Sequence, residues 1–301
     1  MEKFTTWRDK ATGIAPFLPV PEARAESSLV YLSSVAFKTG LFVLKLPIFV
    51  VAYALFVAIP FVPAVSKFLA RLILILFGFY TVDISVDGVK RTNRDLIRAN
   101  HPNDNEIIVV NFTSPLDVII LSSITSNPVF AIPDHAGVLH EFSVTGIIKY
   151  ALSKPSLTDP LPQNKIDFTR LKNKTVYIFA EGATSNNKAV LPFPANLQPL
   201  PKTHKLKSFV LRISPTFLTT PVPVSSLVYL YRALTNVSGV VKGRVVLLDI
   251  DINWIGIRDS FETAGKLRLV GQGLDIQSKL KFLDAYHDNE QKKALKKRKA
   301  F

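Results

Sequence analysis

The chain has 301 residues, 48% of them hydrophobic, no cysteine, and 37 Lys and Arg against 23 Asp and Glu, a formal net charge of +14. The missing cysteine excludes a disulfide framework, a cysteine nucleophile, an iron–sulfur cluster and a thiolate zinc site. A chain this apolar buries enough surface to offset its ordering entropy, which excludes disorder of the whole. High hydrophobicity combined with strong positive charge is typical of a protein that lies against an anionic membrane or binds anionic lipids.

The N-terminal segment, residues 1–34, is polar and lacks the apolar stretch of a signal peptide. A region rich in apolar residues follows, and 21 uncharged residues lie between Lys45 and Lys67. Pro60 and Pro63 would break a helix there.

The prolines leave residues 46–59 as the uninterrupted helical part, about 21 Å long and too short to cross a bilayer comfortably. A second apolar stretch covers residues 72–80. We therefore expect residues 35–81 to form a membrane-associated helical hairpin that enters and leaves on the same side. The alternative is a helical hairpin buried in a soluble core.

Beyond residue 81, segments typical of strands alternate with segments typical of helices. Strands are expected at 82–86, 107–110, 128–132, 175–179, 222–230 and 240–252, helices at 118–124, 142–152 and 275–285, and loops at 91–105 and 155–163. This alternation predicts an α/β domain over residues 82–285, with a sheet flanked by helices.

The C-terminal tail, residues 286–301, holds six Lys and Arg and only two acidic residues. It fits either a frayed, solvated helix end or a patch that contacts lipid. Nucleic-acid binding is set aside, because no binding motif and no interleaved aromatic residues accompany the charge.

Ser114-Pro115-Leu116-Asp117 has the pattern of a helix start, with Ser as N-cap, Pro at the first position and an acid at the third. Capping alone would explain these residues. A helix that begins directly after a buried strand is also where α/β sheets bind anions and place catalytic groups.

Residues 111–117, N-F-T-S-P-L-D, resemble the N-H-x-S-x-x-D motif of the glycerolipid (lysophosphatidic acid) acyltransferase family. Residues 179–185, F-A-E-G-A-T-S, are similar to its F-P-E-G-T-R-S motif, and residues 221–224 resemble a later motif built around proline. The resemblance covers roughly residues 35–260. The N-terminal segment and residues 179–193 look most like the fungal members of endoplasmic reticulum and lipid droplets.

The resemblance implies a glycerolipid acyltransferase-like fold with an apolar membrane hairpin. It implies transfer of an acyl chain from acyl-CoA, oleoyl-CoA in fungal members, to lysophosphatidic acid, which gives phosphatidic acid for glycerolipid and lipid-droplet metabolism. Acyl-CoA would be a co-substrate, with no other cofactor. The expected partners are acyl-CoA, a lysophospholipid and a membrane or droplet surface, and the catalytic domain would face the cytosol.

In that family the motif His is the general base, the Asp orients it, and the Glu-Gly motif binds the acceptor phosphate with an Arg. Here Phe112 stands at the base position and cannot accept a proton, and Thr184 stands at the Arg position. The resemblance implies catalytic roles for Asn111, Ser114 and Asp117. The implied substrate-binding residues are Glu181, Gly182, Thr184, Ser185 and Lys188, with Lys188 as the candidate phosphate-binding charge or, alternatively, a solvated surface lysine.

A substitute base could be His101, His135, His140 or the acceptor's own phosphate, although a loop histidine more often has no such role. The histidine spacing gives no support for a metal site. The alternative function is a catalytically inactive protein of this fold that binds lipids or acyl-CoA in membrane trafficking. The missing motif His and Arg favour that alternative.

Overall fold

The computed structural model describes residues 4–22, 28–134, 136–155 and 164–299. Its centre is a seven-stranded sheet with the order β1-β8-β7-β2-β5-β3-β4. The strands are β1 (Phe79–Val86), β2 (Glu106–Val110), β3 (Pro128–Pro133), β4 (Leu139–Phe142), β5 (Thr175–Ile178), β7 (Lys205–Ser214) and β8 (Gly239–Leu247). The middle strands β7, β2, β5 and β3 run parallel, while β4 is antiparallel to β3 and β8 is antiparallel to β7. A separate pair joins β6 (Ala189–Val190) to β9 (Arg268–Leu269).

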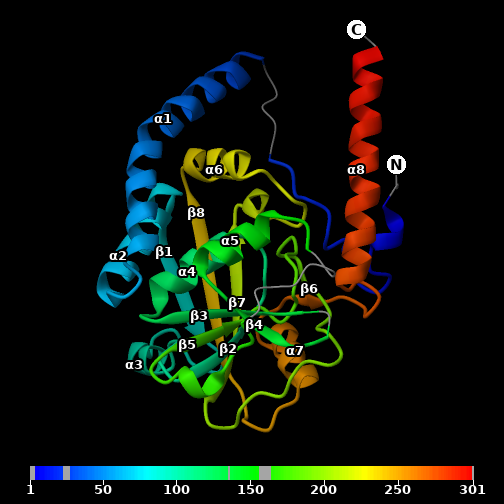
Figure 1. Cartoon of the computed structure of the whole chain (residues 1–301). Helices are drawn as coiled ribbons and strands as arrows, with labels where there is room; N and C mark the ends of the chain where they lie inside the picture. Colours follow the sequence, from blue (N-terminus) through cyan, green and yellow to red (C-terminus); the bar gives the residue numbers. More distant parts are fainter. Residues whose placement is uncertain (1–3, 23–27, 135, 156–163, 300–301) are drawn as a thin grey trace.

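Helices cover both faces of the sheet (Figure 1). One face carries α1 (Ser28–Ala58), α2 (Pro63–Leu76), α4 (Leu116–Ile124), α5 (Val144–Leu152) and α6 (Ser226–Thr235), and the other carries α7 (Trp254–Thr263). In β2, Ile108 and Val110 enter the first core and Ile107 and Val109 the second. This two-sided burial explains the continuous apolar run in the sequence, and it confirms the predicted α/β class.

The predicted helix pair is present, with a break near the prolines, but its arms differ from the expectation. The first arm, α1, has 31 residues and begins at Ser28. By length and composition alone, Val30–Ala58 could cross a membrane, so the expected short helix at 46–59 was wrong. Much of the second apolar stretch is covered by protein: Ile73, Leu74 and Phe79 are buried in the core, whereas Ile75 and Tyr80 are exposed.

Helix α1 has two apolar faces. The inner stripe packs on the domain and consists of Phe42, Leu46, Phe49, Tyr53 and Phe56. The opposite side is exposed and continues onto the start of α2. We call it the outer apolar face, and it comprises Val43, Leu44, Ile48, Val51, Leu55, Phe61, Val65 and Phe68. The Lys45 ammonium donates to the Leu76 carbonyl at 2.8 Å and so fixes α1 to the end of α2.

Several elements differ from the sequence prediction. Residues 222–230 contain no described strand; they lead into α6, where the Ser225 hydroxyl accepts from the Val228 N–H. Residues 91–105 are not all loop, because they contain α3 (Arg94–Ala99), which Asn93 caps. Strand β7 and helix α7 were not predicted. Residues 156–163 of the expected proline-rich loop lie outside the described residues.

The N-terminal segment and the first part of the last helix lie together on one side of the domain (Figure 1). Helix α8 (Ile276–Lys299) continues from the expected helix through most of the basic tail. Phe4, Trp7 and Phe17 surround Phe282 of α8, with ring centroids 5.4, 5.6 and 5.7 Å away. The N-terminal segment is therefore packed against the folded domain.

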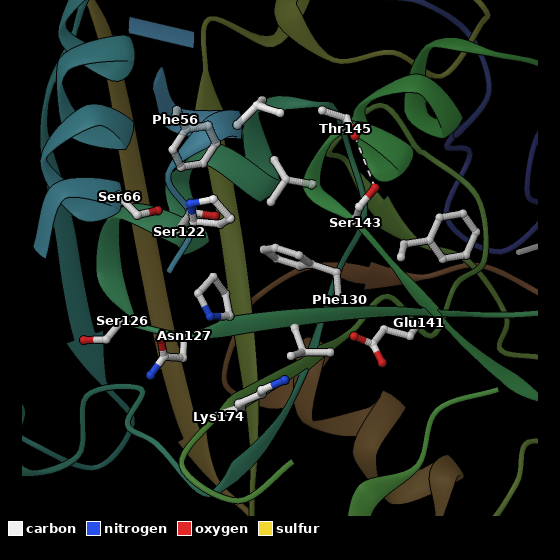
Figure 2. A pocket seen from close by; sticks show the side chains of 16 residues that line it. Phe56, Ser66, Ser122, Ser126, Asn127, Phe130, Glu141, Ser143, Thr145 and Lys174 are labelled. Carbon is white, nitrogen blue, oxygen red and sulfur yellow. Dashed lines mark hydrogen bonds between the residues drawn. The ribbon is translucent and has the colours of Figure 1, made fainter. Parts of the chain in front are cut away.

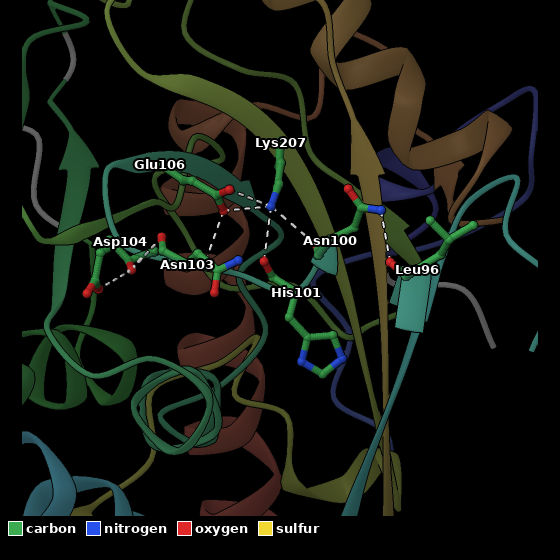
Figure 3. Close-up of polar contacts among 8 residues, drawn as sticks. Leu96, Asn100, His101, Asn103, Asp104, Glu106 and Lys207 are labelled. Atoms are coloured by element: carbon green, nitrogen blue, oxygen red, sulfur yellow. Dashed lines mark hydrogen bonds and ion pairs between the residues drawn. The ribbon is translucent and has the colours of Figure 1, made fainter. Parts of the chain in front are cut away.

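A buried ion pair ties the start of β2 to β7 (Figure 3). The Lys207 ammonium lies 2.6 Å from Glu106 Oε1, and it also donates to the carbonyls of Asn100 and His101. Glu106 Oε2 accepts from the Asn103 N–H at 2.9 Å. The two side chains are 4% and 6% exposed, so either charge left alone would be uncompensated.

We predict that Lys207→Met lowers the free energy of unfolding by about 3–5 kcal/mol, because the Glu106 carboxylate loses its charge partner in a buried site. The double variant Glu106→Gln/Lys207→Met should recover part of that loss. Lys205→Met is the control, since Lys205 is exposed on the same strand. Denaturant unfolding measures all three, and a loss below about 1 kcal/mol for Lys207→Met would contradict the prediction.

Candidate functional site

The two motif segments lie at the carboxyl ends of the neighbouring parallel strands β2 and β5, the edge where α/β sheets place their binding sites. Two hydrogen bonds join the two segments directly. The Phe112 N–H donates to Glu181 Oε1 at 2.8 Å, and the Ser185 N–H donates to the Phe112 carbonyl at 2.9 Å. The structure thus brings together the segments that the sequence singled out 70 residues apart.

Asp117 organises the first segment. Its Oδ2 accepts from the N–H groups of Thr113 at 2.6 Å and Ser114 at 2.9 Å, and the Thr113 hydroxyl donates to Oδ1 at 2.9 Å. The bond from the Ser114 N–H is the one that the predicted capping box assigns to the acid, but the N-cap residue of α4 is Pro115 rather than Ser114, and it makes no side-chain cap bond. Burial raises the pKa of the Asp117 carboxyl to about 7, although the two N–H donors act in the opposite direction. Asp117 is fully buried, so its contacts hold the loop.

Glu181 links the second motif segment to the first and also to a third stretch of chain. Its second oxygen, Oε2, accepts from the Leu191 N–H at 2.8 Å. Burial raises the pKa of the Glu181 carboxyl to about 8, while the two N–H donors and the nearby Arg258 guanidinium favour the charged form. One buried carboxyl therefore fixes three stretches of chain: the end of β2, its own loop and the start of the segment after β6.

The position of the family's base is filled by an aromatic cluster. The Phe112 ring is fully buried, 4.5 Å from the ring of Phe179 and 6.4 Å from that of Tyr150. Asn111 exchanges two hydrogen bonds with the backbone of Leu211 on β7, at 2.7 and 2.9 Å. Neither residue presents a proton acceptor to an open site.

The substrate-binding candidates divide into a buried group and one exposed residue. Gly182 has φ +64°, and a Cβ there would lie 2.6 Å from the Ile276 side chain, so only glycine fits well. The Thr184 hydroxyl donates to the Thr220 carbonyl at 2.5 Å, and the Ser185 hydroxyl donates to the Ala189 carbonyl at 3.2 Å. Lys188 is exposed on the same loop, and its phosphate-binding role stays a prediction.

A different lysine reaches this loop. The Lys279 ammonium, from the first turns of α8, donates to the Thr184 carbonyl at 2.6 Å and approaches its hydroxyl at 3.0 Å. Burial lowers the pKa of Lys279 to about 7, and the charge of Glu181 opposes this. The sequence held a signal for it, because Lys279 shares the apolar helical spacing of Ile276, Phe282 and Leu283.

The histidines considered as substitute bases either lie away from the two motif segments or fall outside the described residues. His101 precedes β2, at the opposite end of the strand from Asp117 (Figure 3). It lines a cavity with Ser123 and Ile124, about 10 Å along α4 from Asp117. His140 Nε2 lies 3.0 Å from Asp134 Oδ2 in the β3–β4 hairpin. His135 lies outside the described residues, and no cluster that could hold a metal ion occurs in the described part of the chain.

An apolar cavity of about 300 Å³ opens beside the start of α4. Its walls come from α1 (Phe49, Tyr53), from Pro115 and from α5 and α6. Tyr229 of α6 lines it and is 7% exposed, and among the described residues its buried hydroxyl has no partner with good hydrogen-bond geometry. Burial raises the pKa of Tyr229 and the Asp117 charge adds to this, whereas the nearby Ser114 side chain and Leu116 backbone act in the opposite direction. Sequence reasoning missed this residue, because the segment was predicted as a strand.

Comparison with known proteins gives full-length relatives, although no family model matches. Lysophosphatidic acid:oleoyl-CoA acyltransferase 1 of Saccharomyces cerevisiae is 28% identical over 97% of this chain and 99% of its own. The chain is a homologue of this fungal acyltransferase. A relative from Schizosaccharomyces pombe, named provisionally for the same activity, is 28% identical over 95% of this chain and 98% of its own.

Among solved structures, the 1-acyl-sn-glycerophosphate acyltransferase PlsC of Thermotoga maritima is similar, with a TM-score of 0.41 and 16% identity over 78% of this chain and 95% of its own. The fungal similarity confirms the resemblance predicted from residues 111–117 and 179–185. It also extends over the N-terminal segment, which in the structure reaches the second motif: the Asn186 side chain donates to the carbonyls of Ala15 at 2.8 Å and Leu18 at 3.1 Å.

We predict that Glu181 makes this homologue less stable as the pH rises from about 4.5 to 8. The folded protein holds the Glu181 proton up to about pH 8, whereas the unfolded chain releases it near the ordinary value of 4.5. The unfolded state therefore gains relative stability across that window, and the effect is constant above it. Glu181→Gln should flatten the pH dependence of the unfolding midpoint between pH 5 and 8. An unchanged slope would contradict this, and Glu290→Gln, at an exposed position, is the control.

Proposed function

We propose that the chain transfers an acyl group from acyl-CoA, preferentially oleoyl-CoA, to lysophosphatidic acid and so forms phosphatidic acid. The observation that supports this most is similarity over nearly the whole length to a fungal lysophosphatidic acid:oleoyl-CoA acyltransferase. The motif segments joined through Glu181, next to an apolar cavity, suit an enzyme for amphiphilic substrates. Acyl-CoA is a co-substrate in this proposal, and no other cofactor takes part.

In the proposed reaction the acceptor's free hydroxyl oxygen attacks the thioester carbonyl carbon, the carbon–sulfur bond breaks, and CoA leaves as the thiol. Because Phe112 replaces the base, the hydroxyl proton passes to the acceptor's own phosphate and then to the leaving sulfur. The cavity beside Pro115 holds apolar chain. The Tyr229 hydroxyl, a buried donor with no well-placed acceptor among the described residues, donates a hydrogen bond to the carbonyl oxygen as its negative charge develops.

The second candidate is a catalytically inactive lipid- or acyl-CoA-binding protein of this fold, with a role in membrane trafficking. The burial of Phe112 in an aromatic cluster favours it, since the mechanism of the wider family needs a proton acceptor at that place. This candidate predicts ligand binding without turnover.

We also propose that the protein sits on a membrane or lipid-droplet surface through the outer apolar face, at the endoplasmic reticulum and on droplets, with the domain in the cytosol. The inner stripe of α1 packs along the domain, so this part of the helix lies along the surface rather than crossing the bilayer. The outer face is larger than the scattered apolar residues normal for soluble proteins; Phe68, for example, is 65% exposed. Leu227 on α6, which packs on α1, is 76% exposed and adds to it.

The catalytic proposal is tested with purified protein, labelled oleoyl-CoA and a panel of lysophospholipids. Wild type should give phosphatidic acid. Tyr229→Phe should lower kcat by about 10²–10³-fold with little change in KM, because only the charged transition state needs the lost donor. Tyr53→Phe is the matched control, since Tyr53 lines the same cavity.

Two results would count against these proposals in different ways. No product above background from wild type with any acceptor would overturn acyl transfer and leave the binding protein. An active wild type with an equally active Tyr229→Phe would retain the enzyme and remove Tyr229 from its mechanism.

For membrane attachment, we predict that Leu44→Glu/Val51→Glu reduces the fraction that floats with phosphatidylcholine–phosphatidic acid vesicles by at least about tenfold, because two charges would enter the apolar part of the interface. Ile255→Glu, at a site on α7 that is 71% exposed, should leave flotation unchanged. Equal flotation of both variants would show that the outer face is not the membrane surface.

A further inference from the structure

A second pocket, of about 350 Å³, lies away from the motif residues, between the end of α1 and the β3–β4 side of the sheet (Figure 2). Phe56 and Val57 of α1 and Phe130 of β3 form apolar walls. Lys174 and Glu141 line the same pocket, and Figure 2 shows both side chains at its lower end, while Phe56 closes the upper end. The pocket is therefore amphiphilic along its length.

The two charged groups at the lower end are opposite in sign but not paired. Both side chains are partly buried, yet within the described residues neither forms an ion pair with the other or with a third group. An ammonium and a carboxylate that share a pocket without contact leave room for a ligand that carries both complementary charges.

An unpartnered hydroxyl lies farther up the pocket. Ser122 of α4 is 2% exposed and lines the pocket, and its Oγ has no hydrogen-bond partner in the described part of the chain. The next residue, Ser123, differs because its hydroxyl donates to the Ile120 carbonyl at 2.7 Å. A buried hydroxyl without a partner is uncommon in folded proteins. The Ser122 Oγ is closed to solvent as placed, and a change of its rotamer toward the pocket lets it donate to an ester or glycerol oxygen of a bound amphiphile.

The pocket also adjoins the exposed apolar side of α1. Val57 lines it and is 42% exposed, close in sequence to Leu55 and Phe61 of the outer apolar face. A lipid at a membrane surface can therefore reach the pocket with its chain along α1. Thr145 lines both this pocket and the cavity beside Pro115, so the two spaces are neighbours, with α5 between them.

We propose that this pocket binds the headgroup of a zwitterionic glycerophospholipid, with the phosphate at Lys174, the ammonium at Glu141, the glycerol or ester oxygens at Ser122 and the start of a chain between Phe130 and α1. This goes beyond acyl transfer, and it does not require that the protein be an enzyme. The site distinguishes a lipid that carries both charges from phosphatidic or lysophosphatidic acid, which carries only the negative charge.

The test is isothermal titration of the full chain in nonionic detergent with three soluble probes: dihexanoyl phosphatidylethanolamine, dihexanoyl phosphatidic acid and inorganic phosphate. We expect the zwitterionic lipid to bind at least about fivefold more tightly than the anionic one, and inorganic phosphate not to compete. Lys174→Ala, Glu141→Gln and Ser122→Ala should each weaken binding of the zwitterionic lipid about three- to tenfold. Glu141→Gln should leave phosphatidic acid binding unchanged or improve it.

Two matched controls separate the site from general surface effects. Lys172→Ala removes an exposed lysine two residues from Lys174, and Ser123→Ala removes the hydrogen-bonded neighbour of Ser122; both should bind like wild type. Equal affinity for the two lipids with no effect of Glu141→Gln would overturn the zwitterion assignment in favour of an anion site. Binding that none of the three pocket variants changes would overturn the site itself. Both readouts are independent of acyltransferase activity.

Discussion

The structure depends on a single buried constraint, the Glu181 carboxyl that accepts from the backbone N–H groups of Phe112 and Leu191. Each donor lies in a stretch of chain without regular pairing, and a buried N–H without an acceptor is costly. This side chain links the end of β2, the loop after β5 and the β6 segment, and the bond from the Ser185 N–H to the Phe112 carbonyl adds a second link between the first two. Lys279 adds α8 to the same loop through Thr184, and Asn186 adds the N-terminal segment. Segments from four parts of the sequence thus converge on residues 179–187.

The sequence predicted the parts of the fold whose pattern is local. Buried strands such as 107–110 have short, self-contained signatures, and the structure confirms this one. The helix start was predicted one residue early, because α4 begins at Leu116 with Pro115 as its N-cap. Residues 222–230 were predicted as a strand, but those from Ser226 on form α6. A short run of apolar residues after Pro223 fits a strand and a capped amphipathic helix equally well, and the cap at Ser225 favours the helix. Hydropathy also could not divide the second apolar stretch, 72–80, into its covered and exposed sides. The fold shows that Ile73, Leu74 and Phe79 are buried against α4 and the sheet, while Ile75 and Tyr80 stay exposed.

The same distinction applies to the site. The resemblance singled out residues 111–117 and 179–185, and the structure brings these two segments together because the strands that precede them are parallel neighbours. The resemblance could not predict what each does, since burial and partners are properties of the assembled fold. The side chains of Asp117 and Thr184 form hydrogen bonds with backbone groups. Tyr229 lies far along the chain and in no motif, and its hydroxyl is the polar group at the cavity that has no well-placed partner among the described residues. The sequence shows Lys279 as a lysine on an apolar helical stripe, but its contact with Thr184 depends on the tertiary structure and could not be predicted from that pattern.

Helix α1 connects these features physically. Its inner stripe supplies Phe49 and Tyr53 to the cavity beside Pro115 and Phe56 to the second pocket, while its outer face is the proposed membrane surface. Any force that moves this helix relative to the domain changes the walls of both spaces at once, because a packed helix shifts as a unit. Lys45, bonded to the end of α2, restrains that movement. In the proposed enzyme, attachment to lipid and the shape of the substrate cavity are therefore not independent properties. A protein without a motif histidine relies on positioning and on a preorganised donor, and both depend on how firmly α1 is held.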